Sequence, residues 1–349
     1  MNLAWPIEID MPGIASGYSR LNRELRTALV RQGVTMTDEA EVGLYVGPAD
    51  LFDPQWPVNV LMTMYETETI PPEWVERCNT ASAVLVPCQH NKEAFKRSGV
   101  QVPIFVVHLG MHAEEWPTMR RVSSSPFRIL FVSWPNQRKG LDVLAQAFWQ
   151  AFLDDPDVEL YLKTSQAWEV RQQAYTLKGV ERFIVDDRQL SHEDLMALYQ
   201  SAHVFVLPSR GEGWGFTAME AMATGCPTVA TNYSGLKEFV TPQTGWPIRH
   251  GWVDVDYGHL TRAAQPDVAH LTEILLSIRR NYPQAAQRAM KGSAMVKDRF
   301  TWEQTAQRTL DCLQRIQQHW RTNGRHTRAG SCRGDRLSSW VASGVGAGV

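Results

Sequence analysis

The stretch "RGEGWGFTAMEAMATGCPTVATNYSGLKEFV", residues 210–240, places two carboxylates in an otherwise apolar segment. Its glycine-rich residues 211–215 follow a run of apolar residues that ends at Ser209, and they precede a predicted helix. Glycine lets the backbone approach a ligand closely, and amides at a helix N-terminus favour anions or hydroxyl oxygens. Glu212 lies in this turn, and Glu220 lies about one turn into the helix. The pattern predicts a ligand site at the turn.

The helix around Glu220 has no polar face apart from this residue, because its neighbours are Phe216, Ala218, Met219, Ala221, Met222 and Ala223. We therefore expect the helix to be buried and the carboxylate to need a partner, which a pair of ligand hydroxyls would supply. The simpler alternatives are an exposed helix position for Glu220 and compensation of the helix dipole by Glu212. The latter is worth about 0.3–1 kcal/mol.

Apolar runs that read as strands alternate with helical periods along the chain. The predicted strands are residues 3–9, 42–46, 58–64, 83–87, 103–109, 127–133, 158–164, 182–186, 203–208 and 227–231. Helices are predicted from Tyr18 onward and over residues 91–99, 140–152 and 302–320. Continuous apolar strands separated by helices indicate parallel sheets buried on both faces. The sequence thus predicts an α/β chain of two halves, with a ligand at the carboxyl ends of the strands in the cleft between them.

The "SSSP" segment, residues 123–126, is the best candidate for a linker. We expect an N-terminal, acceptor-side Rossmann-like domain over residues 1–120 and a C-terminal Rossmann-like domain that binds the nucleotide-sugar over residues 121–300. Residues 301–320 are expected to form a C-terminal helix, and its packing against the N-terminal domain is left open. The Arg-, Ser- and Gly-rich residues 321–349 have no periodicity, so we expect disorder there.

The composition excludes several classes of protein. The 349 residues carry a net charge of -2 and are 44% hydrophobic, which argues against a nucleic-acid partner and fits a globular protein. The five cysteines form no CxxC pair, so neither a disulfide framework nor a zinc site is expected. The first residues show no basic region followed by an apolar one, so we expect no secretory signal; with no apolar run of about 18 residues, we expect a soluble, cytoplasmic protein. A helix with Arg20, Arg23, Arg26 and Arg31 leaves a peripheral membrane contact open, although a solvated face is the preferred interpretation.

The two glutamates with seven residues between them resemble the E-x7-E signature of retaining glycosyltransferases of family 4. Several further segments resemble the surroundings of that motif: residues 195–209, the "SGLKEFV" loop at 234–240, the "RKGLDVLAQAF" element at 138–148, and residues 84–100 and 105–117. The resemblance covers most of residues 1–318. It implies a GT-B fold, in which two Rossmann-like domains with parallel sheets face an interdomain cleft.

The resemblance also implies a reaction and residue roles. A retaining enzyme of this kind moves a sugar from a nucleotide-diphosphate sugar to a hydroxyl acceptor: a polysaccharide, a glycolipid or a small molecule. Glu220 would accept hydrogen bonds from the ribose, and Glu212 would lie beside the transferred sugar. Lys139 would neutralise the diphosphate, and a fixed cation that stabilises a leaving group is worth about 2.7–4 kcal/mol. Backbone amides would hold sugar hydroxyls and phosphate at Gly213, Trp214, Gly215 and Phe216.

The sequence departs from the family pattern at two places, and its first loop at residues 11–20 resembles the glycine-containing first loop of the family. Ser133 and Trp134 stand where the family often has Gly-Arg, and Arg138 is either the substitute cation or a solvated surface arginine. The stretch 61–74 contains Tyr65 and Glu66 but no histidine, so Glu66 either replaces the usual first-domain histidine or is a solvated acid. His90 is an alternative. In the first loop, Ser16 and Gly17 would touch donor phosphate or acceptor, or simply form a turn capped by Ser16.

Two rival functions remain open from the sequence: a nucleotide-sugar hydrolase or epimerase on the same fold, and a non-catalytic nucleotide-sugar-binding protein.

"DVD" at residues 254–256 looks like a metal-binding DxD motif, but three-residue matches are common by chance. We expect no metal and no other cofactor. The base and sugar of the donor, the acceptor and the oligomeric state are not predicted.

Overall fold

The structure, a computed structural model, describes residues 1–6, 17–134, 136–165 and 182–323. The chain divides into two compact units, which we call unit 1 and unit 2. Unit 1 contains Met1–Tyr65, Thr69–Gly110 and the chain from Trp302 on. Unit 2 contains Glu66–Glu68 and Met111–Thr301.

Unit 1 is built on a four-stranded parallel sheet of order β3-β4-β5-β6. Its strands are β3 (Val42–Val46), β4 (Val58–Met62), β5 (Ala83–Val86) and β6 (Ile104–Val106). A short parallel pair, β1 (Asn2–Leu3) with β2 (Thr35–Met36), lies beside it, and Ala4 bridges Gly43 of β3. The helices are α1 (Gly17–Arg31), α2 (Pro72–Asn79) and α3 (Gln89–Ser98). Strand residues such as Leu61 and Val84 are fully buried against Phe95 and Phe52, which accounts for the continuous apolar runs in the sequence.

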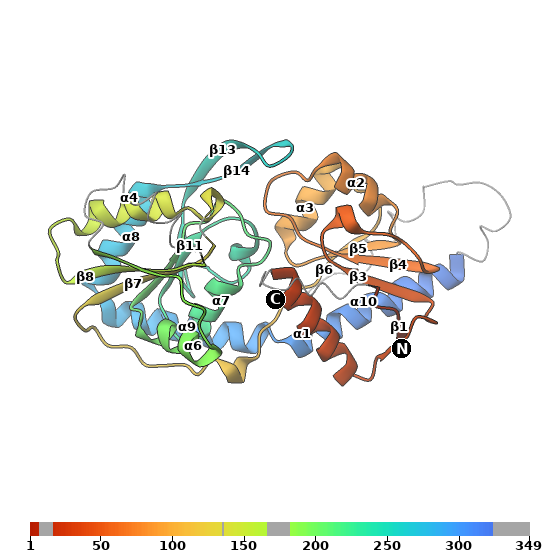
Figure 1. Cartoon of the computed structure of the whole chain (residues 1–349), viewed down its shortest axis with the longest axis horizontal. Helices are drawn as coiled ribbons and strands as arrows, with labels where there is room; N and C mark the ends of the chain where they lie inside the picture. Colours follow the sequence, from red (N-terminus) through yellow and green to blue (C-terminus); the bar gives the residue numbers. More distant parts are fainter. Residues whose placement is uncertain (7–16, 135, 166–181, 324–349) are drawn as a thin grey trace. The chain divides into compact units, whose positions relative to one another are not determined.

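The last described helix, α10 (Trp302–Asn323), packs against α1 and β4. In Figure 1, α10 (blue) runs beside α1 (red). Trp302 and Leu313 are fully buried, and the Thr305 hydroxyl donates to the His108 carbonyl oxygen at 2.9 Å. The end of the described chain therefore belongs to the same unit as its start.

Unit 2 contains a six-stranded parallel sheet of order β12-β11-β10-β7-β8-β9. The strands are β7 (Phe127–Val132), β8 (Val158–Lys163), β9 (Phe183–Asp186), β10 (Val204–Leu207), β11 (Thr228–Thr231) and β12 (Trp246–Ile248). The chain runs outward from β7 through β8 to β9, then returns to the other side of β7 and continues through β10 to β12. The strand order therefore reverses between β7 and β10. In open α/β sheets, ligands bind outside the carboxyl ends of the strands at such a switch point.

Helices cover both faces of this sheet (Figure 1). The pair α4 (Leu141–Phe152) and α8 (Val268–Arg280) pack together, as do α7 (Phe216–Ala223) and α9 (Tyr282–Arg299). The fifth described helix of unit 2 is α6 (His192–Ser201). None of the described helices is long and apolar enough to cross a membrane.

One element of unit 2 was not among the predicted strands and helices. The residues after β12 form an antiparallel hairpin of β13 (His250–Asp256) and β14 (Leu260–Pro266). Asp254 and Asp256, which look like a metal motif in the sequence, lie exposed on alternate positions of β13. No group of three or more His, Cys, Asp or Glu among the described residues could hold a metal ion.

Candidate active site

The two loops that flank the switch point of unit 2 are held against each other. The loop after β7 contains the short 3-10 helix Gln137–Lys139, and the loop after β10 runs through residues 208–215. Gly140 has a φ of +73°, and a Cβ there would lie 2.0 Å from the Pro208 carbonyl oxygen. Only glycine permits this approach. The Arg210 amide then donates to the Arg138 carbonyl oxygen at 2.6 Å, which fixes one loop to the other.

This contact joins Lys139 and Glu212, which are 73 residues apart in the sequence. The Lys139 Nζ donates to Glu212 Oε1 at 2.7 Å and to Oε2 at 2.9 Å. The lysine side chain is 16% exposed and the glutamate 9% exposed, so the pair is largely shielded from water. Burial opposes the charge on the carboxyl, but Lys139 and Arg138 together hold the pKa of Glu212 below its ordinary value. Burial lowers the pKa of Lys139, and Glu212 acts in the opposite direction.

Arg138 is part of the same cluster. One of its Nη atoms donates to the Gly211 carbonyl oxygen and lies 3.5 Å from Glu212 Oε1. The other lies 3.4 Å from Glu66 Oε1, and its side chain is 20% exposed. Arg138 is therefore not a solvated surface arginine, and its role as the substitute phosphate cation stays a prediction. The cluster therefore consists of two cations, Arg138 and Lys139, and two carboxylates, Glu66 and Glu212.

The glycine-rich turn is held on its other side by residues 234 and 235. The Gly235 amide donates to the Glu212 carbonyl oxygen at 3.1 Å, and the Glu212 amide donates to the Ser234 hydroxyl at 2.9 Å. A Cβ on Gly235 would lie 2.6 Å from the Gly213 carbonyl oxygen, so a side chain there would displace the turn. Gly215, with a φ of +105°, leads into α7. The backbone of the turn is thus fixed before any ligand binds.

The side chain of Trp214 belongs to the core. It is 1% exposed and packs against Phe239 and Phe300, with ring centroids 5.5 and 5.4 Å away. A ligand contact by Trp214 therefore has to come from its backbone amide. Phe216, the first residue of α7, follows the turn directly.

Glu220 is buried in α7, at 5% exposure, as the apolar character of its helix predicts. Its Oε2 accepts a hydrogen bond from the Tyr199 hydroxyl of α6 at 2.8 Å. The two glutamates of the E-x7-E motif are therefore anchored by different side chains, Glu212 by Lys139 and Glu220 by Tyr199.

The sequence analysis did not single out Tyr199 or Arg210. Arg210 is 5% exposed and holds Asp142 of α4 through Nη1 at 3.0 Å and Nη2 at 2.7 Å. Its place next to the glycine-rich turn was a usable signal, because a buried arginine there needs a carboxylate partner. Nothing in the sequence indicates that Tyr199 reaches Glu220, since that contact depends on how α6 packs against α7.

The remaining predicted site residues fall in unit 1 or outside the described residues. Gly17 is the first residue of α1, and His90 lies in the first turn of α3. Tyr65 packs edge-on against Trp74 at 5.0 Å, and its backbone is hydrogen-bonded on both sides by the Asn91 side chain. Ser16 lies outside the described residues.

A cation, a buried carboxylate and a glycine-rich turn that leads into a helix, all at the switch point of a parallel sheet, are typical of α/β proteins that bind nucleotides. Residues 88–309 match the sequence profile described as GT4-conflict, Family 4 Glycosyltransferase in conflict systems. The chain belongs to this family of glycosyltransferases.

Individual relatives agree with this assignment. The chain is 29% identical over 212 residues to glycogen synthase of Mycobacterium tuberculosis, a match that covers 59% of this chain and 47% of the relative. It is 27% identical over 186 residues to the GDP-mannose-dependent monoacylated alpha-(1-6)-phosphatidylinositol monomannoside mannosyltransferase of Corynebacterium glutamicum, covering 51% of this chain and 44% of the relative. The chain thus spans about half the length of the curated relatives it matches.

Among solved structures, HepE of Anabaena in complex with UDP and glucose superposes with a TM-score of 0.67 at 15% identity. The superposition covers 90% of this chain and 99% of that chain. The two α/β units have the GT-B fold, as the resemblance in the sequence implies.

Proposed function

We propose that the protein is a retaining glycosyltransferase that moves a sugar from a nucleoside-diphosphate sugar to a hydroxyl acceptor. The observation that carries this proposal is the Lys139–Glu212 pair, placed by the reversal of strand order beside a rigid glycine-rich turn. Two similar proteins support a nucleotide donor, since one is described as GDP-mannose-dependent and the other is bound to UDP and glucose.

The chemistry assigned to this site begins with the diphosphate. An ammonium group can donate three hydrogen bonds, and two of those from Lys139 go to Glu212. The third is directed to a phosphate oxygen, whose charge grows as the bond to the sugar breaks. In a shielded site this interaction is strongest in the transition state, so it accelerates the reaction.

Bond breaking and bond formation take place on one face of the sugar. The bond between the anomeric carbon and the diphosphate oxygen breaks, and the acceptor oxygen forms the new bond from the same side. The acceptor proton passes to the departing phosphate oxygen. Glu212 positions the donor and stabilises positive charge on the ring, and Glu220, held by Tyr199, accepts hydrogen bonds from the ribose.

The first experiment identifies the donor. We screen UDP-, GDP-, ADP- and CMP-sugars by thermal shift, and the donor is the one that raises the unfolding midpoint. A ligand at 100 times its Kd adds about 2.7 kcal/mol of stability. Acceptors are then screened by transfer of the sugar from that donor.

Substitution of the charged pair tests the mechanism. We expect Lys139→Ala to lower kcat by about 10²–10³-fold, because it removes a fixed charge from the leaving group. Glu212→Gln should lower kcat more than it weakens donor binding. Lys291→Ala and Glu273→Gln, at exposed positions on α9 and α8, are the matched controls and should keep wild-type rates.

Wild-type transfer rates in both site variants would overturn the assignment. Release of free sugar or of an isomer alone would support a hydrolase or epimerase instead. Nucleotide binding without turnover across the acceptor panel would support a non-catalytic nucleotide-sugar-binding protein.

A further inference from the structure

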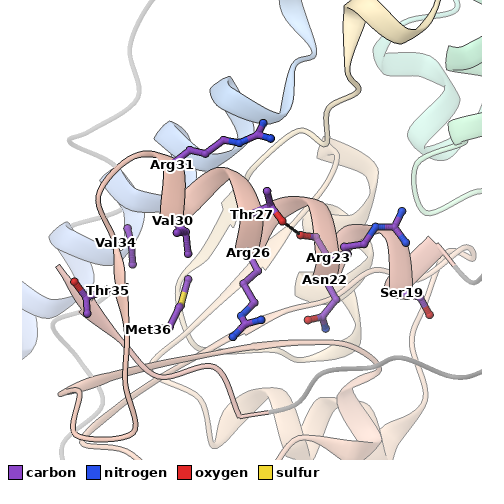
Figure 2. A pocket seen from close by; sticks show the side chains of 10 residues that line it. All are labelled: Ser19, Asn22, Arg23, Arg26, Thr27, Val30, Arg31, Val34, Thr35 and Met36. Atoms are coloured by element: carbon purple, nitrogen blue, oxygen red, sulfur yellow. Dashed lines mark hydrogen bonds between the residues drawn. The ribbon is translucent and has the colours of Figure 1, made fainter.

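A groove of about 810 Å³ runs along one face of α1 in unit 1 (Figure 2). Seven of its lining residues lie on α1 between Ser19 and Arg31, at the spacing that places side chains on one helix face. At 1.5 Å per residue, this part of α1 is about 18 Å long. The groove therefore suits an elongated ligand better than a single small ion.

The lining is cationic and rich in hydroxyls. Three of its ten described residues are arginines, three carry hydroxyl groups and none is acidic. In Figure 2, Arg26 projects from the same side of α1 as Asn22, whereas the guanidinium groups of Arg23 and Arg31 extend outward. Arg26 is half-buried, and Arg23 and Arg31 are exposed. The arginines thus supply one cation within the groove and two at its rim.

The polar floor of the groove is fixed by the fold. The Asn22 amide is 4% exposed, accepts from the Trp5 indole at 2.7 Å and donates to the Val46 carbonyl oxygen at 2.8 Å. Asn22 therefore shapes the groove and leaves ligand contacts to its neighbours.

The rim arginines are available to a ligand. The Arg31 side chain forms no ion pair or hydrogen bond with the other described residues. Within the described ranges, the Arg23 side chain donates to its neighbour Glu24 alone, at 3.0 and 2.8 Å, and it is 70% exposed. Arg23 is open to solvent although the Glu24 side chain is only 15% exposed, and ion pairs screened by solvent are worth about 0–1 kcal/mol, so a ligand anion can compete for Arg23.

We propose that this groove binds an extended anionic oligosaccharide that carries carboxylate or phosphate groups along its chain. Guanidinium groups match such anions bidentately, and the hydroxyls of Ser19, Thr27 and Thr35 suit those of the sugars. A lipid is a poorer match, because Val30, at 50% exposure, is the one strongly exposed apolar side chain among the described lining residues. The binding stands by itself, but a role as acceptor site rests on the proposed function.

Isothermal titration with tetragalacturonate, and with the neutral maltotetraose as its uncharged counterpart, tests the inference. We expect the wild-type protein to bind tetragalacturonate at least about ten-fold more tightly than maltotetraose, and sodium chloride to weaken the binding. Arg26→Ala and Arg31→Ala should each weaken it about five- to twenty-fold. Arg77→Ala, at an exposed position on α2 of the same unit, should change the affinity less than about two-fold. Thermal unfolding midpoints verify that the variants are folded.

Equal affinities for the two oligosaccharides, or unchanged binding in both groove variants, would overturn the inference. Tighter binding of an eight-nucleotide oligothymidylate or of phosphatidylglycerol vesicles, with the same dependence on Arg26 and Arg31, would reassign the groove to nucleic acid or to lipid. Nucleotide-sugar binding is scored separately. If the protein transfers sugar but shows no preference for tetragalacturonate, the inference about the groove is wrong and the proposed function stands. If it binds tetragalacturonate but no nucleotide-sugar, the proposed function is wrong and the inference about the groove stands.

Discussion

The carboxylate of Glu220 is buried in an apolar helix, and the Tyr199 hydroxyl is the hydrogen-bond donor that holds Oε2. If Glu220 accepts from the ribose, Tyr199 acts through it as a positioning residue. We predict that Tyr199→Phe raises the Kd for the nucleotide donor by about five- to ten-fold, which corresponds to about 1 kcal/mol, the worth of one typical hydrogen bond, and changes kcat little. Titration calorimetry with the donor and its free nucleotide measures this.

Tyr282→Phe is the matched control for this substitution. The Tyr282 hydroxyl is also buried, but it donates to the His203 carbonyl oxygen at 3.2 Å. Both variants remove one buried hydroxyl, so both should be somewhat less stable than the wild type. Only Tyr199→Phe should bind the nucleotide donor more weakly. An equal loss of affinity in the two would show that Tyr199 is merely structural.

His203 gives unit 2 a dependence on pH. It is 6% exposed, and its Nδ1 accepts from the Arg128 amide at 3.0 Å. Burial, reinforced by Arg121, Arg128 and Arg279, lowers the pKa of His203 to about 4. Because the folded state binds this proton less readily than the unfolded state, the stability is complete above about pH 6.5 and is lost as the pH falls toward 4.

We predict that His203 alone lowers the free energy of unfolding by about 2 kcal/mol between pH 7.5 and pH 5. Urea unfolding of the wild type and His203→Gln at both pH values measures the difference. The variant should be less sensitive to acid by that amount, and the exposed His192→Gln serves as the control for the substitution itself. Identical pH dependence in wild type and His203→Gln would refute this role.

At the scale of elements, Arg121 connects the carboxyl ends of α6 and α7. Its guanidinium donates to the Tyr199 and Gln200 carbonyl oxygens at 2.9 and 2.8 Å and to that of Ala202. It also donates to the Gly225 carbonyl oxygen at 3.0 Å and to the Thr224 hydroxyl at 2.9 Å. A cation at these ends stabilises both helix dipoles and satisfies carbonyl groups that no water reaches.

We predict that Arg121→Met lowers the free energy of unfolding of unit 2 by at least about 3 kcal/mol, because several buried carbonyl groups lose their donor. Arg120→Met, at the adjacent exposed residue, should stay within about 0.5 kcal/mol of wild type. Urea denaturation at pH 7.5 compares the two. A similar small effect in both variants would contradict the role assigned to Arg121.

Strands such as β3 and β5 could be predicted from the sequence because all their residues are buried. The runs at 42–46 and 83–87 correspond closely to β3 and β5. The β13–β14 hairpin was missed, although Val253 and Val255 alternate with Asp254 and Asp256 as in a strand with one exposed face. The sequence analysis considered these residues only as a possible metal motif, which it set aside, and predicted no strand there. The short strand β12, three residues long, carries too little pattern to be recognised.

At the scale of the whole molecule, the sequence indicates which residues carry chemistry but not which of them meet. Lys139 and Glu212 meet because β7 and β10 are neighbours in the sheet. The order of parallel strands in a sheet cannot be predicted from the residue pattern of each strand. The same limit applies to Tyr199 and Glu220, whose helices pack together only in the folded unit. The resemblance to a family supplies this long-range information, and spacing alone does not.

The chain passes from unit 1 to unit 2 and back, so α10 stabilises the unit in which the chain begins. Leu313 of α10 is fully buried, and α10 packs on α1 and β4. We predict that Leu313→Ala destabilises unit 1 by about 2–5 kcal/mol through the cavity it leaves, without altering the nucleotide binding proposed for unit 2. Hydrogen exchange resolves the two units: amides of β4 should lose protection and those of β7 should keep it, whereas the exposed Gln314→Ala should affect neither. Equal loss of protection in β4 and β7 would mean that the units unfold as one.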